Sequence, residues 1–284
     1  YKELVATNNI NKSKYDVINI WDINNALPKD SIKALKGWVT SIDLSPDHKL
    51  LAIGHGNDTL YIHRTKDGAL VNKYNNHDKA VRSTQFSLDG NYIATGGDDE
   101  LVNVWDIKTK LLKHTFRGHV TDPGGFDAYV EDVIFSPDNK YLLSSSWDGT
   151  SRLWNLESGN EVHTFEGHAD RVMSSAFSQD GKNIITGGDG ADGAIIMWNT
   201  ESSEQIRTYK GHEGVISSLH FFSDAEKIIS TGRRDGTVRI WDTDSTEIAS
   251  IIILQNDYAF VLPDNYYLAS KDASNYVHFV NKLD

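Results

Sequence analysis

Cysteine is absent from this chain of 284 residues. Its absence excludes disulfide bonds, zinc sites built on thiolates and cysteine nucleophiles. A chain without cysteine suits a reducing compartment, where thiols stay reduced and disulfides are rare. We therefore expect a cytoplasmic protein.

Basic side chains are also few: 28 Lys and Arg residues stand against 40 Asp and Glu residues, which gives a net charge of −12. A surface that follows the phosphates of a nucleic acid needs clustered Lys and Arg. The only tight basic pair in a predicted turn is Arg233-Arg234. Apolar runs are short as well, and none approaches the roughly 20 residues of a membrane-spanning helix. We therefore expect neither a nucleic-acid partner nor a membrane partner.

The stretch from Val130 to His168 shows the local pattern of the chain most clearly. Four short apolar runs, at 130–135, 141–145, 150–154 and 161–165, are separated by turns that contain Pro, Asn, Asp and Gly. Runs and turns of this kind predict four antiparallel strands in one sheet. Such a sheet cannot bury both of its faces alone, so neighbouring copies of it are required.

Copies of this unit recur with a period near 43 residues. The aromatic residue that closes the third strand marks each unit, at Trp21, His63 (in a Trp position), Trp105, Trp154, Trp198, Trp241 and Phe279. The spacings between these anchors are 42, 42, 49, 44, 43 and 38 residues. Gly-His pairs recur in phase, at Gly118-His119, Gly167-His168 and Gly211-His212. This regularity predicts a closed array of four-stranded units.

The first and last units are incomplete. Unit one has strands at 4–8, 17–23 and 31–35 but no inner strand before them, and unit seven has strands at 258–262, 266–270 and 276–280 but no outer strand. These two strands would be consecutive in a ring, so an upstream segment of about 20 residues would supply both at ordinary strand lengths. We expect a single domain over residues 1–284, with a ring that such a segment closes.

A His, a Ser or Thr, an Asp and a Trp recur at fixed offsets within four units. The sets are His77, Thr95, Asp99 and Trp105; His119, Ser144, Asp148 and Trp154; His168, Thr186, Asp192 and Trp198; and His212, Thr231, Asp235 and Trp241. One such set alone would suggest a hydrolase triad. An active site occurs once, however, and this pattern occurs four times. We interpret each set as a buried structural network in which the Asp caps a turn, the His donates to it, and the hydroxyl and indole complete the hydrogen bonds.

No other motif indicates catalysis, a cofactor or a metal. The loop at 188–193 has two carboxylates but no spaced third ligand and no closing Glu, so we interpret it as an elongated turn and not as a calcium loop. The pairs Gly96-Gly97 and Gly187-Gly188 precede a turn and a strand, whereas a phosphate loop precedes a helix. We expect no catalytic residue, no cofactor and no bound metal.

Taken together, these signatures resemble the WD-repeat family. The resemblance rests on the three Gly-His pairs, on three Trp-Asp pairs at Trp21, Trp105 and Trp241, and on the recurring Ser-Pro-Asp or Asp-Gly turns; it covers nearly the whole chain. It implies an all-β fold, a seven-bladed β-propeller of four-stranded antiparallel blades. It also implies a rigid, non-enzymatic platform that binds a protein or peptide partner. Units one, two and seven depart from the family's pattern.

A narrower resemblance concerns the decapeptide Leu-Pro-Asp-Asn-Tyr-Tyr-Leu-Ala-Ser-Lys at 262–271. It is similar to the closing segment of bacterial WD-repeat regions, which are often attached to a caspase-like peptidase or another effector domain. Two hypotheses therefore stay open. The chain is an interaction scaffold or sensor module, or it is the regulatory propeller of a larger enzyme whose effector domain lies in the same polypeptide.

The partner-binding surface is predicted from the repeat. The loop before each inner strand and the turn at each network Asp should emerge at one end of the ring. The residues at these positions, together with their neighbours in the turn and in the inserted loop 120–128, are Trp38, Asp98, Phe126, Tyr129, Trp147, Arg171, Arg233 and Arg234. Exposed Trp, Tyr and Arg often dominate protein interfaces. For Trp38, packing against its own unit and exposure at the surface both stay open.

Overall fold

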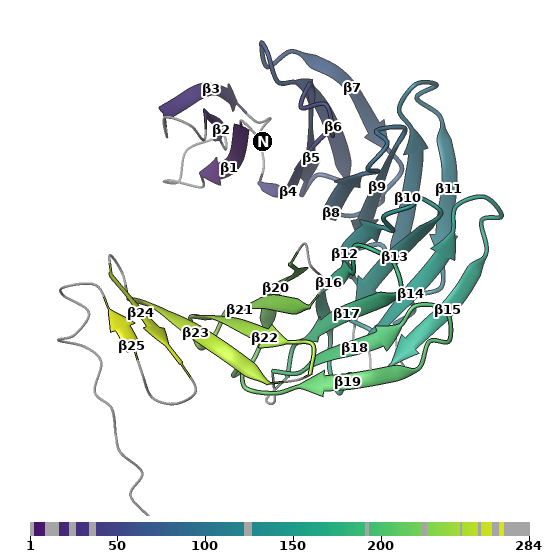
Figure 1. Ribbon diagram of the computed structural model, residues 1–284. Helices are drawn as coiled ribbons and strands as arrows, with labels where there is room; N and C mark the ends of the chain where they lie inside the picture. Colours follow the sequence, from purple (N-terminus) through teal and green to yellow (C-terminus); the bar gives the residue numbers. More distant parts are fainter. Residues whose placement is uncertain are drawn as a thin grey trace, which may run out of the picture. The chain divides into compact units, whose positions relative to one another are not determined.

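The computed structural model of the chain is an all-β protein (Figure 1). It describes residues 3–8, 17–22, 27–33, 38–121, 127–190, 193–222, 226–244, 246–254, 257–262 and 267–269. All strand pairings within this part are antiparallel, as the short turns of the sequence predict. None of these residues belongs to a helix that is long and apolar enough to cross a membrane.

The described strands follow the chain order within each of six sheets. A three-stranded sheet holds β1 (Glu3–Asn8), β2 (Val17–Asp22) and β3 (Leu27–Lys33). The next two sheets hold β4 (Val39–Leu44), β5 (Leu50–His55), β6 (Thr59–Arg64) and β7 (Leu70–Asn75), then β8 (Val81–Phe86), β9 (Tyr92–Gly97), β10 (Leu101–Asp106) and β11 (Leu112–Arg117).

Two further four-stranded sheets follow. They hold β12 (Val130–Phe135), β13 (Tyr141–Ser146), β14 (Thr150–Asn155) and β15 (Glu161–Glu166), then β16 (Val172–Phe177), β17 (Asn183–Gly188), β18 (Ile195–Asn199) and β19 (Gln205–Tyr209). The last sheet holds β20 (Ile216–Phe221), β21 (Lys227–Gly232), β22 (Thr237–Asp242), β23 (Glu247–Leu254), β24 (Asp257–Val261) and β25 (Tyr267–Ala269). Five groups of four strands, from β4–β7 to β20–β23, thus repeat one arrangement.

The same irregularity recurs at the anchor residue of each of the five four-stranded groups. The register between the third and fourth strands shifts at Trp105, Trp154, Trp198 and Trp241, and also at His63. A shift of this kind is a β-bulge, which bends the strand and increases its twist. Its recurrence shows that His63 occupies a Trp position, as the spacing of the anchors predicts.

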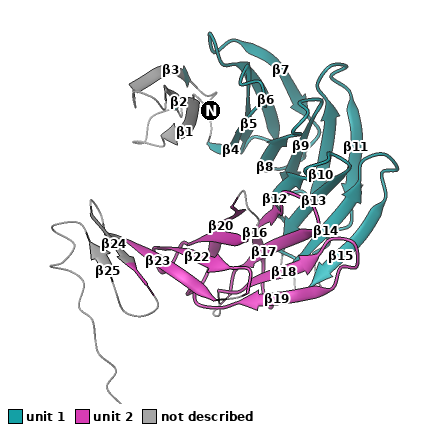
Figure 2. Ribbon diagram, viewed as in Figure 1, with its two compact units in different colours: residues 1–167 teal, residues 168–284 magenta. Residues whose placement is uncertain are grey.

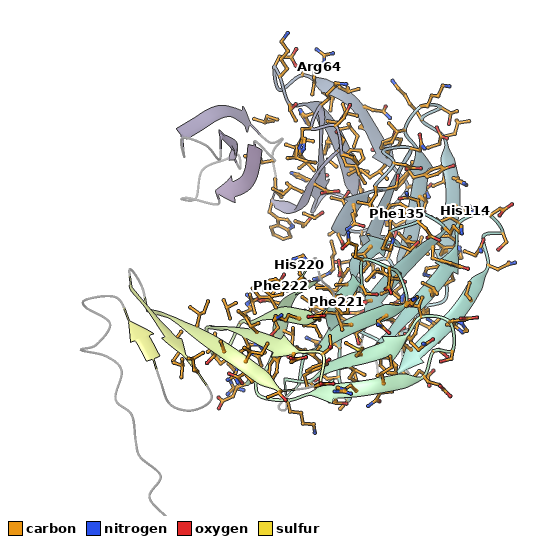
Figure 3. All side chains as sticks on the ribbon, viewed as in Figure 1. Arg64, His114, Phe135, His220, Phe221 and Phe222 are labelled. Atoms are coloured by element: carbon orange, nitrogen blue, oxygen red, sulfur yellow. The ribbon has the colours of Figure 1, made fainter. Side chains whose placement is uncertain are left out.

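The chain divides into two compact units, residues 1–167 and 168–284 (Figure 2). In unit 1, the sheet β8–β11 packs on β12–β15 through a core that includes Val102, Val133 and Trp154. Side chains also join the first strands of neighbouring sheets: Asp43 accepts a hydrogen bond from the Phe86 backbone N–H at 2.6 Å. In the same way, Gln85 accepts one at 2.6 Å from the N–H of Phe135, the last residue of β12, which is labelled in Figure 3. Burial of both faces by such stacking is what a four-stranded unit requires.

The sequence-based boundary between units six and seven differs from the structure. We predicted residues 258–262 as the first strand of a separate seventh unit, but β24 pairs with β23 and extends the sixth sheet to six strands. Only two residues separate β23 from β24, and a connection that short favours a hairpin between the strands it joins. The strand predicted at 276–280 lies outside the described residues.

Candidate functional site: the loop end of the sheets

The sheet β12–β15 shows the His–Asp–Ser–Trp arrangement in full. His119 Nδ1 lies 2.8 Å from Asp148 Oδ2, and its Nε2 lies 2.8 Å from Ser144 Oγ. Trp154 Nε1 donates to the same Ser144 Oγ at 2.8 Å. A carboxylate only accepts, so Nδ1 carries the imidazole proton, Nε2 accepts from the Ser144 hydroxyl, and that hydroxyl accepts from the indole. Each polar group in the chain of hydrogen bonds therefore has a partner.

Asp148 also holds the turn that follows β13. Its Oδ1 accepts from the Thr150 hydroxyl at 2.7 Å and from the Thr150 N–H at 2.9 Å. Burial by itself raises the pKa of Asp148, but the hydrogen bond from His119, with the two bonds from Thr150, outweighs it and holds the pKa below its ordinary value. The carboxylate is therefore ionised at neutral pH, although its side chain is only 6% exposed.

Equivalent contacts occur in the other sheets. His77 Nδ1 lies 2.8 Å from Asp99 Oδ1 and its Nε2 lies 2.7 Å from Thr95 Oγ1, while the Trp105 ring packs edge-on against the imidazole. In unit 2, His168 Nε2 and Trp198 Nε1 both lie 2.8 Å from Thr186 Oγ1. Asp192, the predicted fourth member of that set, lies outside the described residues.

The last set differs from the prediction by one residue. His212 Nδ1 lies 2.8 Å from Asp235 Oδ2, but its Nε2 lies 2.7 Å from Ser230 Oγ, which also accepts from Trp241 Nε1 at 2.8 Å. Thr231, which we placed in this role, instead lies 2.9 Å from Ser217 Oγ. The reason is one additional residue in the turn: five positions separate Ser230 from Asp235, where four separate Ser144 from Asp148. Counting back from the Asp therefore selects the neighbouring hydroxyl, which faces away from the imidazole.

A fifth histidine was missed by the sequence reasoning. The sheet β4–β7 has no histidine before its first strand, but His55 ends β5 at the register position that Gly97, Ser146, Gly188 and Gly232 hold in the other sheets. His55 is fully buried and packs edge-on against Tyr61. The sequence did hold a signal: no Gly-His pair precedes this unit, and a histidine stands at the end of its second strand instead.

A recurring main-chain hydrogen bond marks the end of each sheet at which six of the predicted partner-binding residues lie: Trp38, Asp98, Tyr129, Trp147, Arg171 and Arg233. The residue that follows the second strand donates its N–H to the carbonyl of the residue that precedes the first strand. The pairs are Gly56 to Trp38, Asp98 to Ala80, Trp147 to Tyr129, Asp189 to Arg171 and Arg233 to Val215, at 2.7–3.0 Å. We call this end, with its turns and loops, the loop end of each sheet. Arg233 corresponds to Trp147, so Arg234 is the additional residue of its turn.

The predicted residues differ in exposure at the loop end. Trp38 is 66% exposed, and Arg233 and Arg234 are exposed as well. Tyr129 and Trp147 are half-buried and pack on each other with ring centroids 4.9 Å apart. Arg171 is half-buried beside Asp189. Phe126 lies outside the described residues.

Asp98, which we expected to be exposed, is half-buried because Arg82 covers it. The Arg82 guanidinium pairs with Asp98 and, at 2.9 Å, with Glu131 Oε2, and its Cζ lies 4.7 Å from the ring centroids of both Tyr129 and Trp147. Trp147 Nε1 donates to Glu131 Oε2 at 2.9 Å. Arg82 belongs to β8, and no sequence motif pointed to it. Its stacked, doubly paired position fixes two aromatic rings at the loop end of unit 1.

The buried networks are unsuited to catalysis. Ser144, Thr95, Thr186 and Ser230 are completely buried, so no substrate reaches their hydroxyls. The Ser144 oxygen also accepts from the Trp154 indole, which takes up one of the lone pairs with which that oxygen would attack a substrate. Among the described residues, no three His, Cys, Asp or Glu side chains are grouped so that they could hold a metal ion. Each loop end instead presents turns and loops that hydrogen bonds hold in place.

Comparison with known proteins agrees with the repeat. The family model for the WD domain, G-beta repeat, matches five segments: residues 29–64, 68–106, 110–155, 159–199 and 203–242. Target of rapamycin complex subunit LST8 of Saccharomyces cerevisiae is 28% identical over 105 residues, which are 36% of this chain and 35% of that protein.

Two further relatives share shorter regions. Anaphase-promoting complex subunit cdh1 of Dictyostelium discoideum is 33% identical over 94 residues, 32% of this chain and 12% of that protein. The WD repeat-containing protein 55 homolog of Drosophila persimilis is 30% identical over 84 residues, 29% of this chain and 17% of that protein. The chain thus spans about a third or less of each relative. Because the five matched segments cover most of its residues and fall on sheets of one repeated design, this chain belongs to the WD-repeat family.

Proposed function

We propose that this chain is a non-enzymatic scaffold or recognition module that binds a protein or peptide partner at its loop end. In this proposal the sheets are blades of a seven-bladed propeller, and the loop ends surround its central channel. The observation that carries the proposal is that the repeated polar and aromatic residues are buried, whereas other aromatic and basic residues are exposed at the loop end. The repeated His, Asp, Ser or Thr and Trp side chains are consumed in buried networks, whereas Trp38, Arg233 and Arg234 remain exposed at the loop end.

The family supports this reading. WD-repeat proteins are generally non-enzymatic scaffolds, and two of the relatives, LST8 and cdh1, are by name subunits of multiprotein complexes. Exposed Trp and Arg side chains give a large contact area at a small entropic cost. The buried networks hold the loops in place before binding. Little conformational entropy is then lost when a partner binds, which favours affinity.

The test uses a partner captured on the immobilised full chain and then purified. Trp147→Ala combined with Arg171→Ala is expected to weaken its binding by more than tenfold, about 1.4 kcal/mol, while the far-ultraviolet circular dichroism stays unchanged. The matched control is Leu88→Ala combined with Leu111→Ala. These two exposed residues lie in the turns β8–β9 and β10–β11, at the end of their sheet opposite the loop end. A partner that tolerates the first pair of substitutions and is lost with the second would contradict the proposed face.

A second candidate function follows from the decapeptide at 262–271, which is similar to the end of bacterial propellers attached to effector domains. In that case the chain is the regulatory propeller of a larger enzyme, such as a caspase-like peptidase, and its partner lies in the same polypeptide. The sequence of the full-length gene decides between the two. A peptidase or other effector domain beside these residues would favour the second candidate, and its absence would favour the first.

A further inference from the structure

The loop end of unit 1 is strongly acidic. In its described turns and loops, 56–58, 76–80, 98–100, 118–121, 127–129 and 147–149, seven Asp and Glu residues stand against Lys79 alone. Arg82 and Glu131, which lie just inside the strands, cancel each other. The corresponding turns and loops of unit 2, 168–171, 189–190, 193–194, 210–215 and 233–236, carry four acidic and four basic residues. The excess of negative charge is therefore a property of unit 1.

Trp38 supplies an exposed apolar contact at the same end. Its indole lies over Gly56, where a Cβ atom would overlap the ring, and the Gly56 N–H donates to the Trp38 carbonyl at 3.0 Å. Because glycine has no side chain, Gly56 leaves room for the Trp38 indole, which remains 66% exposed. A large aromatic residue that is fixed from below and open above is a good anchor for a partner side chain.

The aromatic pair of the sheet β12–β15 extends this surface. The sheets β4–β7, β8–β11 and β12–β15 are consecutive neighbours in unit 1, and Trp38 and the Tyr129–Trp147 pair belong to the first and the third. Between them stands the acidic turn of Asp98, Asp99 and Glu100. Arg82 adds no free positive charge there, because it is paired with two carboxylates. A cationic side chain is attracted by the net negative charge of this turn, whereas the faces of Tyr129 and Trp147 are already stacked by Arg82.

We propose that the loop end of unit 1 binds an extended basic peptide segment, with a Lys or Arg side chain over the acidic turn and an apolar or aromatic side chain on Trp38. The inference rests on the proposed function and specifies the partner's chemistry. Complementary charge accelerates association and excludes acidic competitors, while the aromatic contact supplies most of the affinity. The neutral loop end of unit 2 does not discriminate in this way.

The experiment selects peptides without presupposing a partner. A phage-displayed library of random 12-residue peptides is panned on the immobilised full chain at moderate salt, and enriched peptides are measured by fluorescence polarisation. We expect enriched peptides to be net positive, with Lys or Arg a few residues from Trp, Tyr, Phe or Leu. Trp38→Ala should raise their Kd more than tenfold. Gly56→Ala should raise the Kd several-fold, because the new methyl group displaces the Trp38 indole without removing it.

A charge variant and a control complete the test. Asp58→Asn with Asp78→Asn removes two acidic groups outside the His–Asp networks, and it should weaken binding at low salt more than at 1 M NaCl. Leu88→Ala with Leu111→Ala should leave the Kd unchanged. Each variant is checked by its thermal melting curve, so that loss of binding is separated from loss of fold.

The outcomes distinguish the two levels of the proposal. Enriched peptides that are acidic or uncharged, but lose affinity with Trp38→Ala, would overturn the basic-peptide inference and leave the proposed function intact. Peptides that depend on Leu88 and Leu111 would overturn both, because their site would be at the opposite end. If no peptide is enriched, the proposed peptide site on unit 1 is wrong. The proposed partner-binding function would still stand if a folded partner binds and loses affinity with the loop-end variants.

Discussion

Asp148 is the residue whose removal tests the buried network most directly. Asp148→Ala deletes the acceptor for the His119 Nδ1–H and for two donors of Thr150. The His119 side chain is 1% exposed, so water cannot replace the lost partner there. An unsatisfied buried group costs about 1–3 kcal/mol, and Thr150, which is half-buried, recovers part of its hydrogen bonding from water. We therefore expect a loss of about 2–4 kcal/mol in the free energy of unfolding.

The assay is urea denaturation of the full chain, followed by intrinsic tryptophan fluorescence. The midpoint should fall while the slope m stays constant, because the substitution changes stability and not the surface exposed on unfolding. Two variants serve as controls. Asp148→Asn keeps one acceptor oxygen and should lie between wild type and Asp148→Ala, and Glu157→Ala, in the exposed turn after β14, should match wild type. Equal midpoints for Asp148→Ala and Glu157→Ala would refute the reasoning.

Three other predictions concern single contacts. Ser230→Ala should lower the free energy of unfolding, measured by urea denaturation, by about 1–3 kcal/mol more than Thr231→Ala, because only Ser230 is bonded to both an imidazole and an indole. The reverse order would restore the assignment made from the sequence. Acid should destabilise unit 2. Burial lowers the pKa of His212, and at Asp235 burial alone would raise the pKa, but hydrogen bonds outweigh it and lower the pKa to about 2. The unfolded chain therefore binds more protons than the folded chain at both groups. Stability should therefore fall as the pH drops from about 6.5 toward 2, measured as urea midpoints at pH 7.5, 5 and 3, and a midpoint that rises would contradict it. Gly96→Ala should cost about 1–3 kcal/mol, seen in thermal melts, because its Cβ would lie 2.5 Å from a methyl of Val130 on the next sheet; an unchanged melt would show that the sheets part easily.

Much of the fold could be predicted because each unit repeats its own turn chemistry. The strand predicted at 130–135 is β12, and those predicted at 150–154 and 161–165 differ from β14 and β15 by one residue at the end. The boundary that we placed between units six and seven was wrong because the sequence indicates where strands lie but not which strand pairs with the next when the connection is short. The period marks repeats, and it cannot show that β24 continues the sheet of β23.

The candidate site was less predictable for a related reason. Fixed offsets located His119, Ser144 and Asp148 because their turn has the common length, but one additional residue before Asp235 moved the hydroxyl role to Ser230. The burial of Asp98 depends on Arg82, whose own position carries no motif. Side chains that act through contacts between sheets leave no trace in the spacing within one sheet.

The main-chain bond that closes each loop end has a consequence for how this surface can change. It runs from an N–H to a carbonyl, so it does not depend on the side chain, and the donor position is accordingly Gly56, Asp98, Trp147, Asp189 or Arg233 in the five sheets. A small, an acidic, an aromatic or a basic residue is held at the same place by the same atoms. Substitution at these five positions would therefore change the side chains that the loop ends present, one sheet at a time, while the same main-chain atoms hold the backbone. If the loop ends bind a partner as we propose, its specificity can change without a change of scaffold.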